Sequence, residues 1–163
     1  MSDQPLPAST NNQYDFTGTH ALADVIGVHP DVVYDESRIL TAVSEGIQRA
    51  GATVCGVQIH RFSPRGFTAL FLLSESHVSV HTYPEHGAMF IDAFTCGTRC
   101  DPTLIVNTLL DELGTHEHVF TAFRRGAPGH SEIVAHDSAS ALAERQGQRA
   151  RRFPVTSGQP GAA

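Results

Sequence analysis

Apolar and polar residues alternate along much of the chain with the period of two that is typical of β-strands. This pattern predicts strands at residues 16–26, 54–62, 67–73, 78–83, 89–96 and 118–123. The segment 67–73 is apolar almost throughout, so we expect it to be a central strand buried on both faces. Segments 63–66 and 84–87 carry Pro and Gly at turn positions, and they predict hairpin connections between neighbouring strands.

Two other segments place apolar residues at helical spacing. Asp35 is a suitable N-cap for the first helix, and Gly51 is a suitable stop signal. Asp101 followed by Pro102 predicts the start of the second helix, and Gly114 predicts its end. The expected buried stripes consist of Ile39, Leu40, Val43 and Ile47 in the first helix and of Ile105, Leu109, Leu110 and Leu113 in the second.

The order of these elements, β-α-β-β-β-β-α-β, predicts the α+β class. We expect a two-layer sandwich, with a mostly antiparallel sheet and with the helices packed on one face. Residues 15–126 form the expected domain, preceded by a disordered leader at 1–14 and followed by a tail at 127–163. A short helix over 138–152 is an option within that tail. Because an exposed sheet edge needs cover, we also expect a homo-oligomer, such as a dimer that extends the sheet.

The composition of the chain limits the chemistry that it performs. All 11 basic residues among the 163 are Arg, and the absence of Lys excludes pyridoxal-phosphate enzymes and Walker A phosphate loops. The net charge of −6 argues against a nucleic-acid partner, and the lack of a long apolar run argues against a membrane partner. The three Cys and ten His lack the spacing of a zinc site. We therefore expect a cytoplasmic protein without a metal.

Polar residues are concentrated in segment 73–85, directly after the apolar strand. Ser79 and His81 are expected on one face of the next strand, because side chains alternate along a strand. A hairpin at 84–87 would place that strand beside the one ending at Cys96, so that a hydroxyl, an imidazole and a thiol converge. Spacing alone leaves two interpretations open: nucleophilic catalysis by Ser76 or Cys96 with a His base, or ordinary surface residues. No GxSxG motif is present, and Cys96 lacks the helix start that commonly activates a thiolate.

Three motifs make the chemistry specific. They are Ser-Glu-Ser-His at 74–77, His-Thr-Tyr-Pro-Glu at 81–85 and Asp-Ala-Phe-Thr-Cys-Gly at 92–97. Together they resemble the bacterial and archaeal S-adenosylmethionine decarboxylase proenzymes, and the resemblance runs from about residue 18 to residue 126. It implies a pyruvoyl cofactor that is made from a serine of the chain itself, which is compatible with the absence of Lys.

The resemblance also implies roles for individual residues. Self-cleavage between Glu75 and Ser76 would yield a β chain of residues 1–75 and an α chain of residues 76–163, with the pyruvoyl group derived from Ser76. His81 matches the processing base, which removes the α-proton of residue 76. Cys96 matches the proton donor that acts after the pyruvoyl group has formed a Schiff base with the substrate and CO₂ has left. The resulting decarboxylated S-adenosylmethionine would serve spermidine biosynthesis.

Three further residues match substrate-binding positions of the family. Thr68 offers a hydroxyl, Phe62 offers a ring for stacking on adenine, and Glu85 offers a carboxylate for the sulfonium or the ribose. Each also has an ordinary structural interpretation: Thr68 as a strand residue, Phe62 as a core residue and Glu85 as a turn residue.

The chain departs from the family at several positions, which leaves the substrate less defined than the cofactor. Tyr83 stands where the family commonly has Trp, Thr19 stands where a basic residue is usual, and 86–89 lacks the usual aromatic sequence. Apart from Glu75, no acidic residue lies within 74–84 to clamp a cationic tail, which favours S-adenosylmethionine over ornithine or arginine. An unprocessed binding or regulatory homologue is the alternative outside enzymology.

Overall fold

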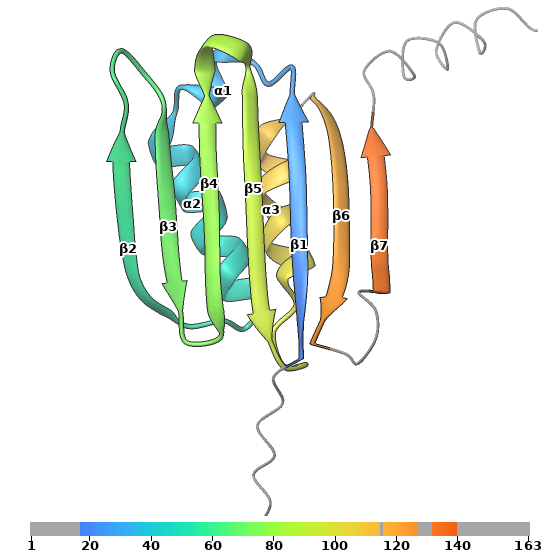
Figure 1. The fold of residues 1–163 in the computed structure, drawn as a ribbon. Helices are drawn as coiled ribbons and strands as arrows, with labels where there is room; N and C mark the ends of the chain where they lie inside the picture. The colour runs from blue at the N-terminus through green and yellow to red at the C-terminus, as the bar shows by residue number, and fades with distance from the viewer. Residues whose placement is uncertain (1–16, 115, 127–131, 140–163) are drawn as a thin grey trace, which may run out of the picture.

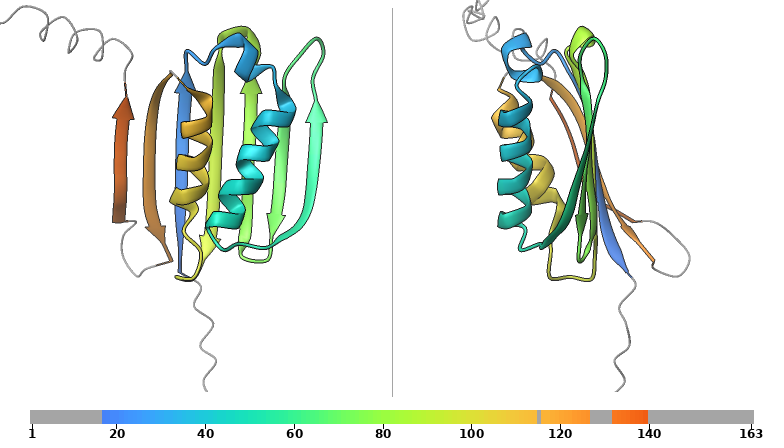
Figure 2. Two further views of the ribbon diagram at one scale, coloured as in Figure 1. Left: turned by 180° about the vertical axis from the view of Figure 1, so that it is seen from behind. Right: turned by 90° about the vertical axis from the view of Figure 1, so that its left-hand side faces the viewer.

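The chain forms a two-layer sandwich in which one antiparallel sheet carries helices on a single face (Figures 1 and 2). The computed structural model describes residues 17–114, 116–126 and 132–139. The strands lie in the order β2-β3-β4-β5-β1-β6-β7, and every neighbouring pair is antiparallel. Their bounds are β1 Gly18–Ile26, β2 Val54–Arg61, β3 Phe67–Leu73, β4 Ser76–Tyr83, β5 Ala88–Cys96, β6 Glu117–Arg125 and β7 Glu132–Ala139. The α+β prediction is confirmed.

Two long helices, α2 (Glu36–Arg49) and α3 (Pro102–Leu113), lie side by side on the same face of the sheet (Figure 2). The Asp35 carboxylate caps α2 by accepting a hydrogen bond from the Arg38 N–H at 3.0 Å. Asp101 caps α3 in the same way, accepting from the Thr103 N–H at 2.9 Å. Both predicted helices are thus confirmed. The structure adds a short helix, α1 (Pro30–Val33), and a 3₁₀ turn, η1 (Pro84–His86).

The core fills the space between these helices and the sheet. Ile39, Val43 and Ile47 of α2 are buried against it, and the strands contribute every second residue. The two helices approach closely at Gly46, where an added Cβ would lie only 2.9 Å from the Cα of Ile105. Because the helices cover only this face, the other side chains of each strand point away from them.

The second face of the sheet has no covering layer among the described residues (Figure 2, right). We refer to it as the open face. Polar residues gather on it, but it also exposes Leu70, Leu72 and Phe90, with 41%, 57% and 43% of their surfaces accessible. A solvated sheet face normally carries mainly polar side chains. The open face is therefore unusually apolar for a surface in contact with water.

The structure corrects two expectations about the strands. β3 is not buried on both faces, because no described layer covers the open face and β3 turns Leu70 and Leu72 toward it. β7 adds a strand within a segment that the sequence indicated as a tail, and it includes the first two residues of the suggested helix at 138–152. The rest of that helix and the leader at 1–14 lie outside the described residues. No helix in the described part of the chain is long and apolar enough to cross a membrane.

Candidate active site

Ser76 is the first residue of β4, where the chain reverses direction after β3. Its hydroxyl lies 3.2 Å from Nδ1 of His77. The preceding carbonyl, that of Glu75, accepts a hydrogen bond from the backbone N–H of Cys96 at 2.9 Å. The peptide bond between Glu75 and Ser76 is therefore held against the end of β5. The Cys96 N–H donates to its carbonyl oxygen, and the Ser76 hydroxyl belongs to the residue that follows the carbonyl.

The side chain of Glu75 anchors the same reversal to the loop before β2. Its carboxylate accepts a hydrogen bond from the Thr53 N–H at 3.0 Å, and the Ser74 N–H donates to the Thr53 carbonyl, also at 3.0 Å. The Ser74 hydroxyl and the Thr53 N–H lower the pKa of Glu75, because both stabilise the ionised carboxylate. Glu75 therefore fixes the turn as an anion.

Cys96 ends β5 with an exposed side chain, one residue beyond the partner of Ser76 in the strand register. The thiol thus comes from the strand beside Ser76, as the sequence predicted. Cys100 differs from it, since it is buried and its thiol donates to the Gly51 carbonyl. Burial raises the pKa of Cys100, which makes it a structural cysteine.

Four side chains extend from Ser76 across the open face in one hydrogen-bonded chain. His77 Nε2 lies 3.1 Å from Asp92 Oδ1, and His20 Nε2 lies 2.7 Å from Asp92 Oδ2. Arg125 Nη1 lies 3.1 Å from His20 Nδ1. Sequence reasoning missed this chain as a functional unit. Its members come from β4, β5, β1 and β6, so the alternation within any one strand does not reveal it.

His81 lies farther along β4, opposite Thr68 of β3 in the strand register. The Thr68 hydroxyl and Nδ1 of His81 are 2.9 Å apart, so the two predicted residues do form a pair. His81 lies five positions along the extended strand from Ser76, which amounts to about 16 Å. Within one chain the structure therefore does not bring His81 to Ser76.

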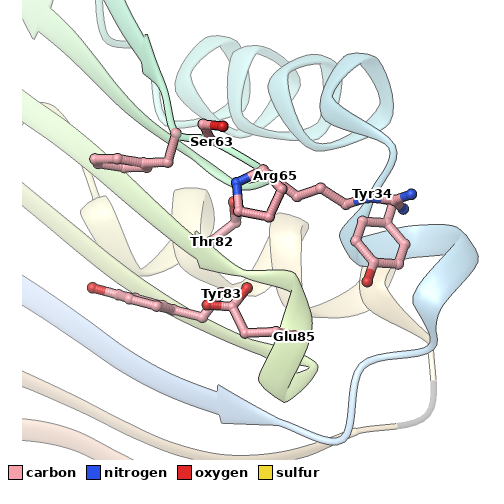
Figure 3. Close-up of a pocket in the computed structure, with 8 residues that line it drawn as sticks. Tyr34, Ser63, Arg65, Thr82, Tyr83 and Glu85 are labelled. Atoms are coloured by element: carbon pink, nitrogen blue, oxygen red, sulfur yellow. The ribbon is translucent and has the colours of Figure 1, made fainter.

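A cavity of about 660 Å³ lies at the far end of β4, around the turn between β2 and β3 (Figure 3). Phe62 and Glu85, two of the three predicted substrate-binding residues, line it, whereas Thr68 does not. Tyr34 contributes another aromatic ring, and Arg65 contributes a guanidinium group. The central guanidinium carbon of Arg65 lies 4.7 Å from the centre of the Tyr34 ring. The complete lining is Tyr34, Phe62, Ser63, Pro64, Arg65, Thr82, Tyr83 and Glu85.

The predicted site residues thus fall into groups at opposite ends of one strand. Ser76 begins β4, and Cys96 ends the neighbouring strand β5 beside it. Glu85 follows the other end of β4, which is about 23 Å away because the strand has eight residues. The pair of Thr68 and His81 lies between these groups. In the described part of the chain, no cluster of three or more His, Cys, Asp or Glu residues is arranged to hold a metal ion.

Comparison with known proteins agrees with the motifs. Residues 19–126 match the family model described as S-adenosylmethionine decarboxylase. The S-adenosylmethionine decarboxylase proenzyme of Parasynechococcus marenigrum is 39% identical over 111 residues, covering 68% of this chain and 87% of that protein. The proenzyme of Brevibacillus brevis is 42% identical over 101 residues, covering 62% and 76%. The crystal structure of the adenosylmethionine decarboxylase from Aquifex aeolicus superposes with a TM-score of 0.61 at 25% identity, covering 77% of this chain and 98% of that one.

Proposed function

Because this chain belongs to the S-adenosylmethionine decarboxylase family, we propose that it cleaves itself between Glu75 and Ser76 and then decarboxylates S-adenosylmethionine. The observation that carries the proposal is the position of the Glu75–Ser76 peptide bond. Its carbonyl oxygen already accepts a hydrogen bond from the Cys96 N–H. The hydroxyl that would attack this carbonyl belongs to Ser76, the next residue in the chain. The word proenzyme in the relatives' names supports a precursor that is cleaved to become active.

The cleavage begins with an acyl shift. The Ser76 oxygen adds to the Glu75 carbonyl carbon, and the carbonyl oxygen becomes negatively charged beside the Cys96 N–H, which stabilises that charge. Collapse breaks the bond to the Ser76 nitrogen and leaves an ester. Removal of the α-proton of residue 76 then expels the Glu75 carboxylate. The dehydroalanine that remains tautomerises to an imine, and water hydrolyses the imine to a pyruvoyl group with loss of ammonia.

The surroundings of Ser76 fit a pyruvoyl group. An amide donor and a thiol lie beside the residue, and the chain has no Lys whose amine could hold pyridoxal phosphate as a Schiff base instead. The pyruvoyl ketone supplies the electron-accepting centre for loss of CO₂. In this arrangement Cys96 provides the proton that replaces the lost carboxylate, since its exposed thiol ends the strand beside Ser76.

The cavity around Phe62 supports an adenosyl substrate. The Phe62 and Tyr83 rings offer flat faces for a base, and Glu85 offers acceptors for ribose hydroxyls. Arg65 lines the same cavity and offsets the charge of Glu85. An arginine or ornithine tail needs an excess of negative charge, which this cavity lacks among its lining residues.

A complete site requires a second copy of the chain. Ser76 and Cys96 are about 23 Å from Glu85 within one chain, a distance that a single substrate does not bridge. A two-fold pairing of open faces would place the end of one β4 over the start of the other. It would also cover Leu70, Leu72 and Phe90. This homodimer differs from the edge-to-edge dimer that the sequence suggested.

Intact-mass measurement of the purified protein tests the proposal. The wild type should give two chains, residues 1–75 and residues 76–163, the second beginning with a pyruvoyl group. Ser76→Ala should remain one chain of 17.5 kDa. The cleaved protein should release CO₂ from S-adenosylmethionine but not from ornithine or arginine. A wild type that stays whole for days at neutral pH would contradict the proposal and would favour an unprocessed binding protein.

A further inference from the structure

The hydrogen-bonded chain from Arg125 to Ser76 has only one consistent direction. An Arg guanidinium donates and never accepts, so Nδ1 of His20 must accept from Arg125. The proton of a neutral His20 then sits on Nε2 and is donated to Asp92. The second Asp92 oxygen is left to accept from Nε2 of His77. Nδ1 of His77 therefore carries a lone pair, and it faces the Ser76 hydroxyl.

We propose that His77 is the general base of the acyl shift, and that Asp92 and His20 hold it in the required tautomer. The proposal rests on the self-cleavage proposed above and adds the group that activates the hydroxyl. His77 meets the definition of a catalytic residue, since it contacts the reacting Ser76 oxygen at 3.2 Å. Asp92 and His20 are positioning residues because they act through His77.

The proton transfers balance without any other reactant. Nδ1 of His77 takes the hydroxyl proton as the Ser76 oxygen bonds to the Glu75 carbonyl carbon. Asp92 stabilises the imidazolium, and the Cys96 N–H stabilises the oxyanion. The imidazolium then returns the proton to the Ser76 nitrogen as the carbon–nitrogen bond breaks. The products are an ester, a free amine and a neutral His77.

This role is separate from that of His81. His81 is about 16 Å from Ser76 along β4 and bonds to Thr68 instead, so within one chain it does not reach the hydroxyl. The resemblance assigns His81 to the later removal of the α-proton. Two imidazoles would therefore serve two successive steps, the first within one chain and the second across the proposed dimer.

The partial burial of His20 and Asp92 supports their role as positioning residues. The side chain of His20 is 14% exposed and that of Asp92 is 30% exposed, although both lie on the open face. The rings of Phe94 and Phe123 pack against His20, with ring centres 5.5 and 5.3 Å away. His20 is thus largely shielded from water, which strengthens its hydrogen bond to Asp92.

The test measures the rate of self-cleavage in the full-length chain by intact mass. His77→Ala should slow cleavage by about 100-fold or more, the usual contribution of a general base. Added imidazole should restore part of the rate, because it replaces the missing ring. Asp92→Asn should also slow cleavage, since an amide that donates to Nε2 of His77 would move the ring proton to Nδ1. His136→Gln, on β7, is the matched control and should cleave at the wild-type rate.

Two further measurements separate this role from a structural one. In the His77→Ala background, Asp92→Asn should slow cleavage no further, because its effect passes through His77. Hydroxylamine cleaves esters, so it should release fragments from a chain blocked at α-proton removal, such as His81→Ala, but not from His77→Ala. Cleavage of His77→Ala within about threefold of wild type, or its cleavage by hydroxylamine, would overturn the proposal. Failure of the wild type to cleave would instead overturn the proposed function.

Discussion

The backbone N–H of Cys96 donates to the carbonyl oxygen of Glu75 at 2.9 Å, which joins the end of β5 to the peptide bond before Ser76. The same residue thus offers two separable groups to the site. Its backbone amide faces the bond that must break, whereas its side chain is exposed at the end of the strand. A substitution of the side chain leaves the amide in place, so cleavage and turnover respond differently.

Cys96→Ala should still cleave itself but should lose turnover. The amide donor to Glu75 remains, whereas the thiol that reprotonates the substrate carbon is gone. We expect kcat to fall by about 10²- to 10⁴-fold, the usual contribution of a positioned acid. Cys55→Ala is the matched control, because that exposed thiol lies on β2 at the sheet edge. Full decarboxylase activity in cleaved Cys96→Ala would contradict the donor assignment.

Phe62→Ala should weaken substrate binding without changing self-cleavage. Loss of one aromatic stacking partner costs about 0.5–1.5 kcal/mol, so KM for S-adenosylmethionine should rise by up to about tenfold. Leu104→Ala removes a similarly exposed apolar side chain from α3, on the opposite side of the sheet, and should leave KM unchanged. An unchanged KM in Phe62→Ala would exclude this ring from the substrate site.

Mixed dimers should report whether two chains share each site. One chain carries Cys96→Ala, and the other carries Phe62→Ala together with Glu85→Ala. If each site combines the two ends of different chains, random pairing of these impaired chains should recover about a quarter of wild-type kcat/KM. The matched control pairs Phe62→Ala with Glu85→Ala, which damage the same end and should not complement. Absence of recovery in verified heterodimers would place the whole site in one chain.

Gly46→Ala should destabilise the fold although Ala favours helices. The added Cβ would lie 2.9 Å from the Cα of Ile105, so α2 and α3 must move apart. Overpacking of this kind costs about 1–3 kcal/mol, against a helix-propensity gain of about 1 kcal/mol. Denaturant unfolding in the uncleavable Ser76→Ala background measures the difference, with Gln48→Ala on the exposed side of α2 as control. A more stable Gly46→Ala would show that the helices are not in close contact.

Cys100 should react with iodoacetamide more slowly than Cys55 and Cys96. Burial raises the pKa of Cys100, so less of its reactive thiolate is present at a given pH, and the side chain is also shielded. Peptide mass analysis at timed intervals near pH 8 measures the three rates. Labelling of Cys100 as early as the two exposed thiols would contradict both its burial and its raised pKa.

Local signals in the sequence determined the helices and the central hairpin. Asp35 and Asp101 cap helices within a few residues of their own positions, so their effect is visible without tertiary contacts. Alternation likewise placed Ser79 and His81 on a common face. The three motifs identified the family, and the match over residues 19–126 confirms it.

Only the tertiary structure decided which of these residues meet. The apolar sequence of β3 does not tell which of its faces another layer covers, so β3 was expected to be buried on both faces although Leu70 and Leu72 are exposed on the open face. His77 finds Asp92 15 residues away, and His20 reaches Asp92 across 72 residues. Such contacts depend on the strand order, which places β1 beside β5. A pattern with period two specifies a face, but the pairing of strands specifies a site.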